Sequence, residues 1–459
     1  MSGIVLIAAL AIVAPRVAHT EALLVVEADS GKVLEAHDAT IPWYPASVTK
    51  MMTAYVTLKA VKEGRLSLDT LLTVSPVAAS QSPSKMGLRP GTQVTVENAL
   101  AMMLVKSAND MAVVLAEGVG GSIDGFSAQM NQAAQHLGMT QTSYVNPNGL
   151  PADGQITSAR DLAILARAII HDLPEYEYFY HIPAIRYGRK VTNNFNHLIG
   201  RYPGADGFKT GFICASGYNL VGSATRDGRR LIAVVLGSTS GHMRAVRAAQ
   251  LLERGFANNT LSWLRPSLGI VDNLVPVDAS PPNLRDEMCG GKRHKPASDE
   301  DEEIATGNAG SVTAANPALT FFAAGLQPPM AKPSELLAAG PAAAEPMVVY
   351  TGPKKEGAAL IAAMAVDSEK QTARRGKRSR VAAKKPDAGS EPKTEATDAK
   401  PEPKPAAVRH ANARPEAAPK AGEKPVAATE KPAAKPKAAA KPKPAPKSTT
   451  GEAAAPPRS

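Results

Sequence analysis

Residues 217–238 read GYNLVGSATRDGRRLIAVVLGS, and this stretch decides the fold class. Two apolar runs flank Asp227-Gly228, a dipeptide typical of the tight turn between antiparallel strands. A similar pattern occurs near the start of the chain, where residues 22–39, ALLVVEADSGKVLEAHDA, place two apolar runs around Asp29-Ser30-Gly31. The sequence therefore predicts one β-hairpin at each end of the folded region.

Apolar residues at helical spacing fill the interval between the two hairpins. The predicted helices cover 47–61, 96–105, 109–119 and 158–171, and an amphipathic helix over 242–256 follows the second hairpin. Strands at both ends with helices between them are typical of an α+β domain. We expect one antiparallel sheet flanked by helices.

The composition divides the 459 residues into unequal parts. Residues 22–265 hold nearly all the periodic apolar pattern and suffice for one large core. We expect residues 266–340 to be a linker with little regular structure. Residues 341–459 are rich in Ala, Pro and Lys and predict a disordered basic tail, since such a composition buries little apolar surface.

Charge is concentrated in that tail, where residues 367–459 carry 22 Lys and Arg against 11 Asp and Glu. The net charge of the whole chain is +10, so the rest of the chain is close to neutral. The basic character therefore gives no reason to expect a nucleic-acid partner of the folded part. Contact of the tail with an anionic envelope surface and a solvated spacer are both open.

The N-terminus and the cysteines bear on the compartment. Residues 4–14 are an apolar run too short to span a membrane but suited to the core of a signal peptide. We therefore expect residues 1–21 to be a signal peptide and the protein to be exported, although no Lys or Arg precedes the run. Two cysteines, Cys214 and Cys289, are too few for a disulfide framework; two unpaired thiols are the default interpretation, and a bridge between them is the alternative.

Several kinds of catalytic chemistry lack their motifs. The chain has no HExxH for a metal hydrolase, no G-x-S-x-G elbow, and neither of the common phosphate-binding glycine loops. We expect no cofactor and no metal. A lysine is left as the candidate base.

Residues 44–55, YPASVTKMMTAY, supply a serine and a lysine three positions apart, Ser47 and Lys50. On a helix these side chains share one face, close enough for the amine to bond the hydroxyl. A free lysine has a pKa near 10.4, so a general base at neutral pH needs burial or a second cation nearby. Taken alone, the pair is better explained as a helix-capping serine beside a surface lysine.

Two further segments change the balance. KSAND, residues 106–110, places Ser107 and Asn109 at a break between two helices, where a capping role is the simpler alternative. DGFKTGF, residues 206–212, places Lys209 and Thr210 ahead of the second hairpin, where they could bind an anion.

Together the three segments form the ordered set S-x-x-K, S-x-N and K-T-G of penicillin-binding proteins and class A β-lactamases. The chain resembles the low-molecular-mass penicillin-binding proteins that act as serine-type D-alanyl-D-alanine carboxypeptidases. The likeness spans about residues 22–258 and includes SGKVLEAHDATIPWYPASVTKMMT, NPNGLP, SARDLA and RRLIAVVLG. It implies the β-lactamase/DD-peptidase (transpeptidase-like) fold.

The resemblance also implies roles. Ser47 would be the nucleophile, Lys50 its base and Ser107 the proton relay. The substrate-binding residues would be Asn109, Lys209, Thr210, Gly211, Phe212 and Arg244, with Arg247 as the alternative to Arg244. The implied partners are peptidoglycan stem peptides and β-lactam inhibitors, and the implied place of action is the periplasm or cell envelope.

This sequence departs from the family pattern at several points, so other functions stay open. S-A-N replaces S-G-N, and neither a second β domain nor a terminal amphipathic helix is evident after residue 265. A D,D-endopeptidase and a β-lactamase are the related alternatives, although Glu175 and Glu177 do not stand in the text expected of a deacylating glutamate. A non-enzymatic envelope-binding protein is the alternative from another class.

Overall fold

The computed structural model describes residues 21–257, 267–290, 333–338, 344–362 and 365. The chain divides into two compact units, Met1–Pro386 and Asp387–Ser459, and all described residues belong to the first. The expected signal peptide (apart from residue 21) and most of the expected tail lie outside the described residues.

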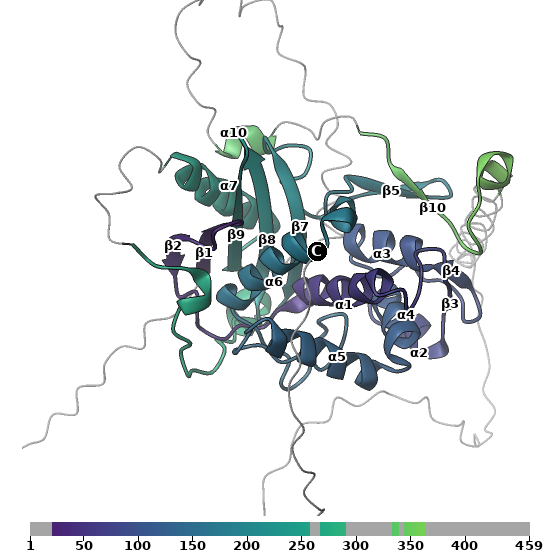
Figure 1. The fold of residues 1–459 in the computed structure, drawn as a ribbon, viewed down its shortest axis with the longest axis horizontal. Coiled ribbons are helices and arrows are strands. Elements are labelled where there is room, and N and C mark those ends of the chain that lie inside the picture. Colours follow the sequence, from purple (N-terminus) through teal and green to yellow (C-terminus); the bar gives the residue numbers. More distant parts are fainter. Residues whose placement is uncertain (1–20, 258–266, 291–332, 339–343, 363–364, 366–459) are drawn as a thin grey trace, which may run out of the picture. The chain divides into compact units, whose positions relative to one another are not determined.

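A five-stranded antiparallel sheet of order β2-β1-β9-β8-β7 forms the centre of this unit (Figure 1). Its strands are β1 (Ala22–Glu27), β2 (Val33–His37), β7 (Ala205–Ile213), β8 (Gly217–Arg226) and β9 (Arg229–Ser238). Both predicted hairpins are present, and β1 pairs with β9 along its whole length. The first and last parts of the domain therefore meet in the middle of one sheet, which confirms the predicted α+β class.

Alternate side chains of the sheet pack on opposite faces, as the two-residue period of a strand requires. Leu24 and Val26 join the core shared with the N-terminal helices, whereas Val25 joins the core under α7 (Gly241–Ala257). Both faces are covered, so the sheet strands consist of nearly unbroken apolar runs.

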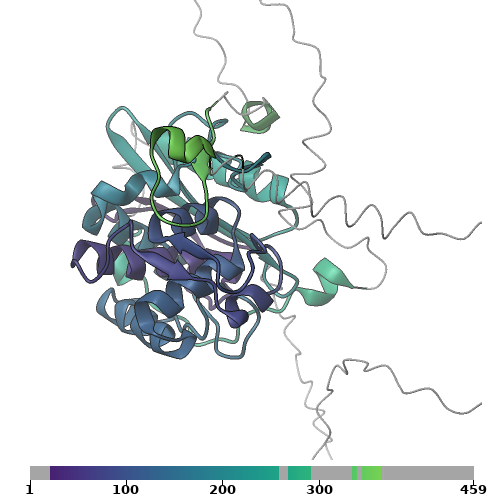
Figure 2. The same ribbon diagram turned by 90° about the vertical axis from the view of Figure 1, so that its right-hand side faces the viewer.

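Most of the helices gather on one side of the sheet (Figure 2). They are α1 (Lys50–Lys62), α2 (Pro76–Ser80), α3 (Val96–Val105), α4 (Asn109–Gly120), α5 (Ile123–His136) and α6 (Ala159–Asp172), with the 3-10 helices η1 (Ala46–Thr49) and η2 (Pro174–Tyr180). The predicted helices over 96–105, 109–119 and 158–171 agree with α3, α4 and α6 within a residue. The predicted 47–61 helix begins as η1 and continues as α1.

Shorter elements complete the unit and were not predicted. They are the ribbon β3 (Leu71–Thr73) with β4 (Gln93–Thr95), the ribbon β5 (Ala184–Tyr187) with β6 (Lys190–Asn193), η4 (Val271–Asn273), α8 (Arg285–Cys289), α10 (Pro333–Ala338) and β10 (Met347–Val349). Among the described helices, none is both long and apolar enough to cross a membrane.

The expected boundary at residue 265 is wrong. Residues 267–290 continue along the domain: Val271 donates its backbone N–H to Gly31, and Leu284 donates its own to Ala215. Met288 is buried in the main core, and Cys289 forms a disulfide with Cys214, so the expectation of two unpaired thiols is also wrong. The two cysteines are 75 positions apart, so no local pattern in the sequence indicates that they pair.

The expected start of a structureless tail at residue 341 also needs correction. Strand β10 pairs in parallel with β5, and Val349 is only 1% exposed within the main core. Tyr350 then donates its backbone N–H to Asn98 of α3. A short apolar triplet in a polar stretch, MVV, finds its partners only through tertiary contacts.

Candidate active site

The candidate site lies where η1 and the first turn of α1 meet β7 and the break between α3 and α4 (Figure 1). Ser47 lies in η1 and Lys50 is the first residue of α1, so the helical turn places both on one face. The Lys50 amine lies 2.9 Å from Ser47 Oγ, as the three-residue spacing predicted.

Lys50 is completely buried, and its amine has protein acceptors besides Ser47. It lies 2.7 Å from Asn109 Oδ1 and 2.7 Å from the carbonyl oxygen of Asn148. Helix α4 and the 146–149 turn therefore each supply one oxygen acceptor to the Lys50 amine, and these two contacts fix the amine beside the Ser47 hydroxyl.

The Asn109 amide is engaged at both ends, because its Nδ2 donates to the carbonyl of Ser82 at 2.9 Å. The sequence assigned Asn109 to a substrate amide, whereas the structure shows it holding Lys50 and the 82–84 loop. The contribution of Asn148 was missed. It is made by a backbone carbonyl, and the Asn-Gly turn at 148–149 was its only signal in the sequence.

Backbone conformation at the site is unusual at two non-glycine residues. Ala46, directly before Ser47, has φ +50°, and Ser107 in the break between α3 and α4 has φ +58°. A non-glycine residue in this left-handed region typically costs about 1–3 kcal/mol. Strain of this kind is typical of sites where the surrounding structure fixes a functional side chain, and here it occurs at Ser107 and at the residue directly before Ser47.

Gly149 allows the 146–149 turn to reach η1. Its φ is +79°, and a Cβ at this position would lie 1.8 Å from the carbonyl oxygen of Ala46. Any side chain would therefore separate the Asn148 carbonyl from Lys50.

A cavity of about 150 Å³ opens onto Ser47. Of the predicted site residues, it is lined by Ser47, Ser107, Asn109 and Phe212. The other lining residues are Pro83, Ser84, Gly149, Leu150, Phe195 and Ile213. Segments from six separate stretches of the chain thus line the cavity at the nucleophile candidate.

The remaining predicted residues lie behind this lining. Lys209 and Thr210 are both buried on β7, and the Lys209 amine donates to the Thr210 carbonyl at 3.0 Å. Arg244 of α7 is 2% exposed and directs its guanidinium toward the Gly211 carbonyl at 3.5 Å and the Phe195 carbonyl at 3.4 Å. The structure therefore brings Arg244 to β7.

Arg247, the alternative arginine, is directed elsewhere. It forms an ion pair with Glu21 at 3.0 Å, next to the first strand. Glu21 also accepts a hydrogen bond from Ser238 Oγ at 2.8 Å, which links the start of β1 to the end of β9.

Asp110 is a buried support that the sequence prediction missed. Its carboxylate accepts the backbone N–H groups of Met86, Gly87 and Met111 at 2.8–3.0 Å, which attaches the 84–87 loop to the start of α4. Burial raises the pKa of Asp110 despite these three hydrogen bonds. An acidic residue in the first turn of a helix was its signal.

The two glutamates considered for a β-lactamase lie away from the cavity. Glu175 pairs with Lys62 at 3.0 Å, and Glu177 contacts Arg230. Neither lines the cavity that contains Ser47. In the described ranges, no three His, Cys, Asp or Glu side chains gather as metal ligands.

Comparison with known proteins agrees with this geometry. The sequence profile of the Peptidase_S11 family, described as D-alanyl-D-alanine carboxypeptidase, matches residues 10–240. D-alanyl-D-alanine carboxypeptidase DacC of Escherichia coli K12 is 37% identical over 254 residues, which cover 54% of this chain and 64% of the relative. DacB2 of Mycobacterium tuberculosis H37Rv is 35% identical over 246 residues, covering 51% of this chain and 82% of the relative.

A solved structure shows the same likeness. Penicillin binding protein 5 from Haemophilus influenzae is 36% identical with a TM-score of 0.51, covering 53% of this chain and 73% of that one. The match spans under two thirds of the length of DacC and similarly of DacA from Haemophilus influenzae, 64% in each case. Through the profile match and these similarities, this chain belongs to the D-alanyl-D-alanine carboxypeptidase family, Peptidase_S11.

Proposed function

We propose that this protein is a serine-type D-alanyl-D-alanine carboxypeptidase that removes the terminal D-Ala from peptidoglycan stem peptides. The observation that carries the proposal is the buried Lys50 amine 2.9 Å from Ser47 Oγ, held by Asn109 and Asn148 in a member of this family. A serine activated by a positioned neighbouring base is the arrangement that covalent acyl transfer requires.

In the proposed reaction, neutral Lys50 accepts the Ser47 proton as Oγ attacks the carbonyl of the penultimate D-Ala. The backbone N–H groups of Ser47 and Phe212 stabilise the oxyanion, and such donors typically contribute about 3–4 kcal/mol each. The C–N bond then breaks, and the proton passes to the departing D-Ala amine through Lys50 and Ser107. Water finally hydrolyses the ester, with Lys50 again as the base.

Positively charged side chains of the protein bind the terminal carboxylate of the substrate in this proposal. Lys209, Thr210 and Arg244 lie on β7 or beside it and supply two cations and a hydroxyl. A carboxylate bound there would orient the scissile bond toward Ser47. The position of Asn109 favours a structural part for this residue, with its amide fixing Lys50 instead of gripping the peptide.

The same chemistry makes Ser47 the target of β-lactams, whose strained amide mimics the D-Ala-D-Ala end. A stem-peptide substrate also implies action at the periplasmic face of the cell envelope, as the apolar run at residues 4–14 predicts. Contact of the basic 367–459 segment with an anionic envelope surface stays a prediction.

The test is D-Ala release from a peptide that ends in D-Ala-D-Ala, measured with the purified full chain and with Ser47→Ala. We expect release by the wild type and loss of both release and fluorescent-penicillin labelling in the variant. Ser80→Ala is the matched control, because Ser80 bonds only Val77 in the described structure and lies outside the cavity.

Two results would contradict the proposal. One is a wild-type protein that neither releases D-Ala nor is labelled by penicillin. The other is rapid turnover of a penicillin instead of a long-lived acyl-enzyme, which would make the protein a β-lactamase.

A further inference from the structure

A second cavity adjoins the one that contains Ser47. It has a volume of about 250 Å³ and shares Gly149, Leu150 and Ile213 with the first. Its other lining residues include Asp153, Ala215, Asn283 and Arg285. The two cavities therefore meet at the end of β7, directly after Phe212.

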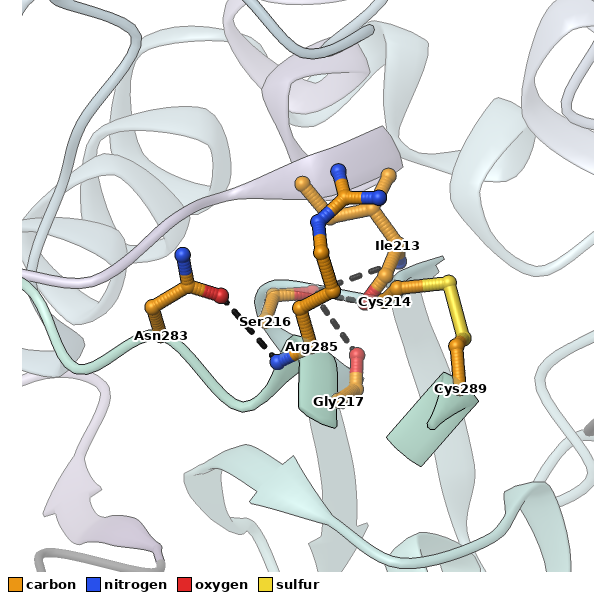
Figure 3. The surroundings of a disulfide bond; sticks show 7 residues. All are labelled: Ile213, Cys214, Ser216, Gly217, Asn283, Arg285 and Cys289. Carbon is orange, nitrogen blue, oxygen red and sulfur yellow. Dashed lines mark hydrogen bonds between the residues drawn. A yellow bond between two sulfur atoms is a disulfide. The ribbon is translucent and has the colours of Figure 1, made fainter. Parts of the chain in front are cut away.

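One wall of this second cavity comes from the segment around α8, which is held at both ends (Figure 3). The backbone N–H of Leu284 donates to the Ala215 carbonyl at 3.0 Å, and Cys289 is bonded to Cys214. Leu284 and Met288 are 5% and 4% exposed, so the inner face of this turn is buried in the main core. Arg285 lies between these attachments and points away from the core.

Arg285 brings an exposed cation to the cavity. In the described part of the chain, its guanidinium forms no hydrogen bond or ion pair, and its backbone N–H donates to Asn283 Oδ1 at 3.1 Å. Asp153 lines the same cavity from the opposite segment, and no ion pair joins the two side chains. A guanidinium in this setting is suited to a carboxylate of a ligand.

The direction of the substrate follows from the proposed function. Its terminal carboxylate lies at Lys209 and Thr210, and its scissile carbonyl lies at the N–H of Phe212. An extended peptide rises about 3.3 Å per residue, so the residue before D-Ala-D-Ala passes Ile213. Its side chain would enter the second cavity, where Arg285 stands.

We propose that Arg285, held against β7 by the Cys214–Cys289 disulfide, is a specificity-determining residue that binds a carboxylate on the side chain preceding D-Ala-D-Ala. The inference rests on the proposed function. It adds a preference for anionic donor peptides, and it makes that preference depend on an oxidised cysteine pair.

The test compares acetyl-L-2-aminoadipyl-D-Ala-D-Ala with its side-chain carboxamide, two peptides that differ in one charge. For the wild type we expect kcat/KM to favour the carboxylate peptide about fivefold, the effect of one charge pair in a partly open site. Arg285→Gln should bring this ratio close to one, and Asp153→Asn should increase it, because it removes a like charge. Arg65→Gln is the matched control, since Arg65 lines neither cavity.

The disulfide is tested with the double variant Cys214→Ser/Cys289→Ser, which should lose the preference as Arg285→Gln does. Calorimetry with Ser47→Ala measures the affinity of both peptides, and therefore the same preference, without turnover. Equal affinities there, or an unchanged ratio in Arg285→Gln, would overturn the inference. Failure of the proposed function would appear differently, as absence of D-Ala release and of penicillin labelling in the wild type.

Discussion

Gly211 of β7 lies directly against the backbone of Ser47. A Cβ on Gly211 would stand 2.7 Å from the Ser47 nitrogen and 3.0 Å from that of Val48. These are backbone atoms at the start of a helix and cannot move aside independently. The third residue of K-T-G thus sets how closely β7 approaches Ser47, the proposed nucleophile.

Gly211→Ala should therefore push β7 away from η1. A displacement of about 1 Å at a reacting centre can cost on the order of 100-fold in rate, and we expect penicillin acylation of Ser47 to fall by that factor. Gly118→Ala is the control, because the atoms nearest to its Cβ belong to the Leu72 side chain, which can move, and not to backbone. Equal acylation rates in wild type and Gly211→Ala would contradict this reading of the contact.

Asn109→Asp tests whether Lys50 must become neutral. The substitution places a carboxylate oxygen where Asn109 Oδ1 now lies, 2.7 Å from the amine. The added charge stabilises the ammonium form, so acylation at neutral pH should fall about 100-fold and its pH profile should move to higher pH.

Asn131→Asp is the control for a mere loss of stability, because Asn131 bonds the backbone of Tyr144 away from the cavity. The measurement is the rate of penicillin acylation from pH 6 to 10 in the wild type and both variants. A uniform loss with no shift of the profile would mean that Asn109 acts only through the fold.

The disulfide should contribute strongly to stability. Cys214 and Cys289 are 75 residues apart, and closing a loop of that size lowers the entropy of the unfolded chain by the equivalent of about 4 kcal/mol. Cys214→Ser/Cys289→Ser should therefore lower the midpoint of urea unfolding. Reducing agent should lower the wild-type midpoint likewise and leave that of the variant unchanged.

Strand β10 is expected to be part of the stable domain. Val349→Ala removes buried methyl groups next to β5 and should lower the free energy of unfolding by about 2 kcal/mol. Met347→Ala, at a partly buried position of the same strand, should cost less. Equal stability of Val349→Ala and wild type in urea unfolding would show that the domain does not need this strand.

The raised pKa of Asp110 predicts how the stability of the protein depends on pH. Burial raises the pKa of this carboxyl in the folded protein above its ordinary value of 3.8. Its contribution to stability is therefore fullest below pH 3.8 and is lost as pH rises through the folded-state pKa. The stability of wild type relative to Asp110→Asn should fall between pH 4 and 7, as measured by thermal unfolding across that range. A rise over the same interval would contradict the direction of the shift.

Local patterns predicted the parts of the fold with strong periodicity. Helices α3, α4, α6 and α7 and both hairpins follow from apolar spacing and turn residues, which act within a few positions. The β3–β4 and β5–β6 ribbons were not predicted, because strands of three or four residues carry too few side chains for a period. Strand β10 was not predicted, because its pairing with β5 lies about 160 residues away.

Local patterns were enough to find the reactive groups of the site: a serine and a lysine one helical turn apart, followed in order by Ser107, Lys209 and Thr210. The surroundings of these groups were set by the tertiary structure. It brought the Asn148 carbonyl to Lys50, directed Arg244 rather than Arg247 toward β7, and joined Cys214 to Cys289. The physical reason is range, since hydrogen-bonding groups and spacing are local properties, whereas burial and convergence depend on how distant segments pack.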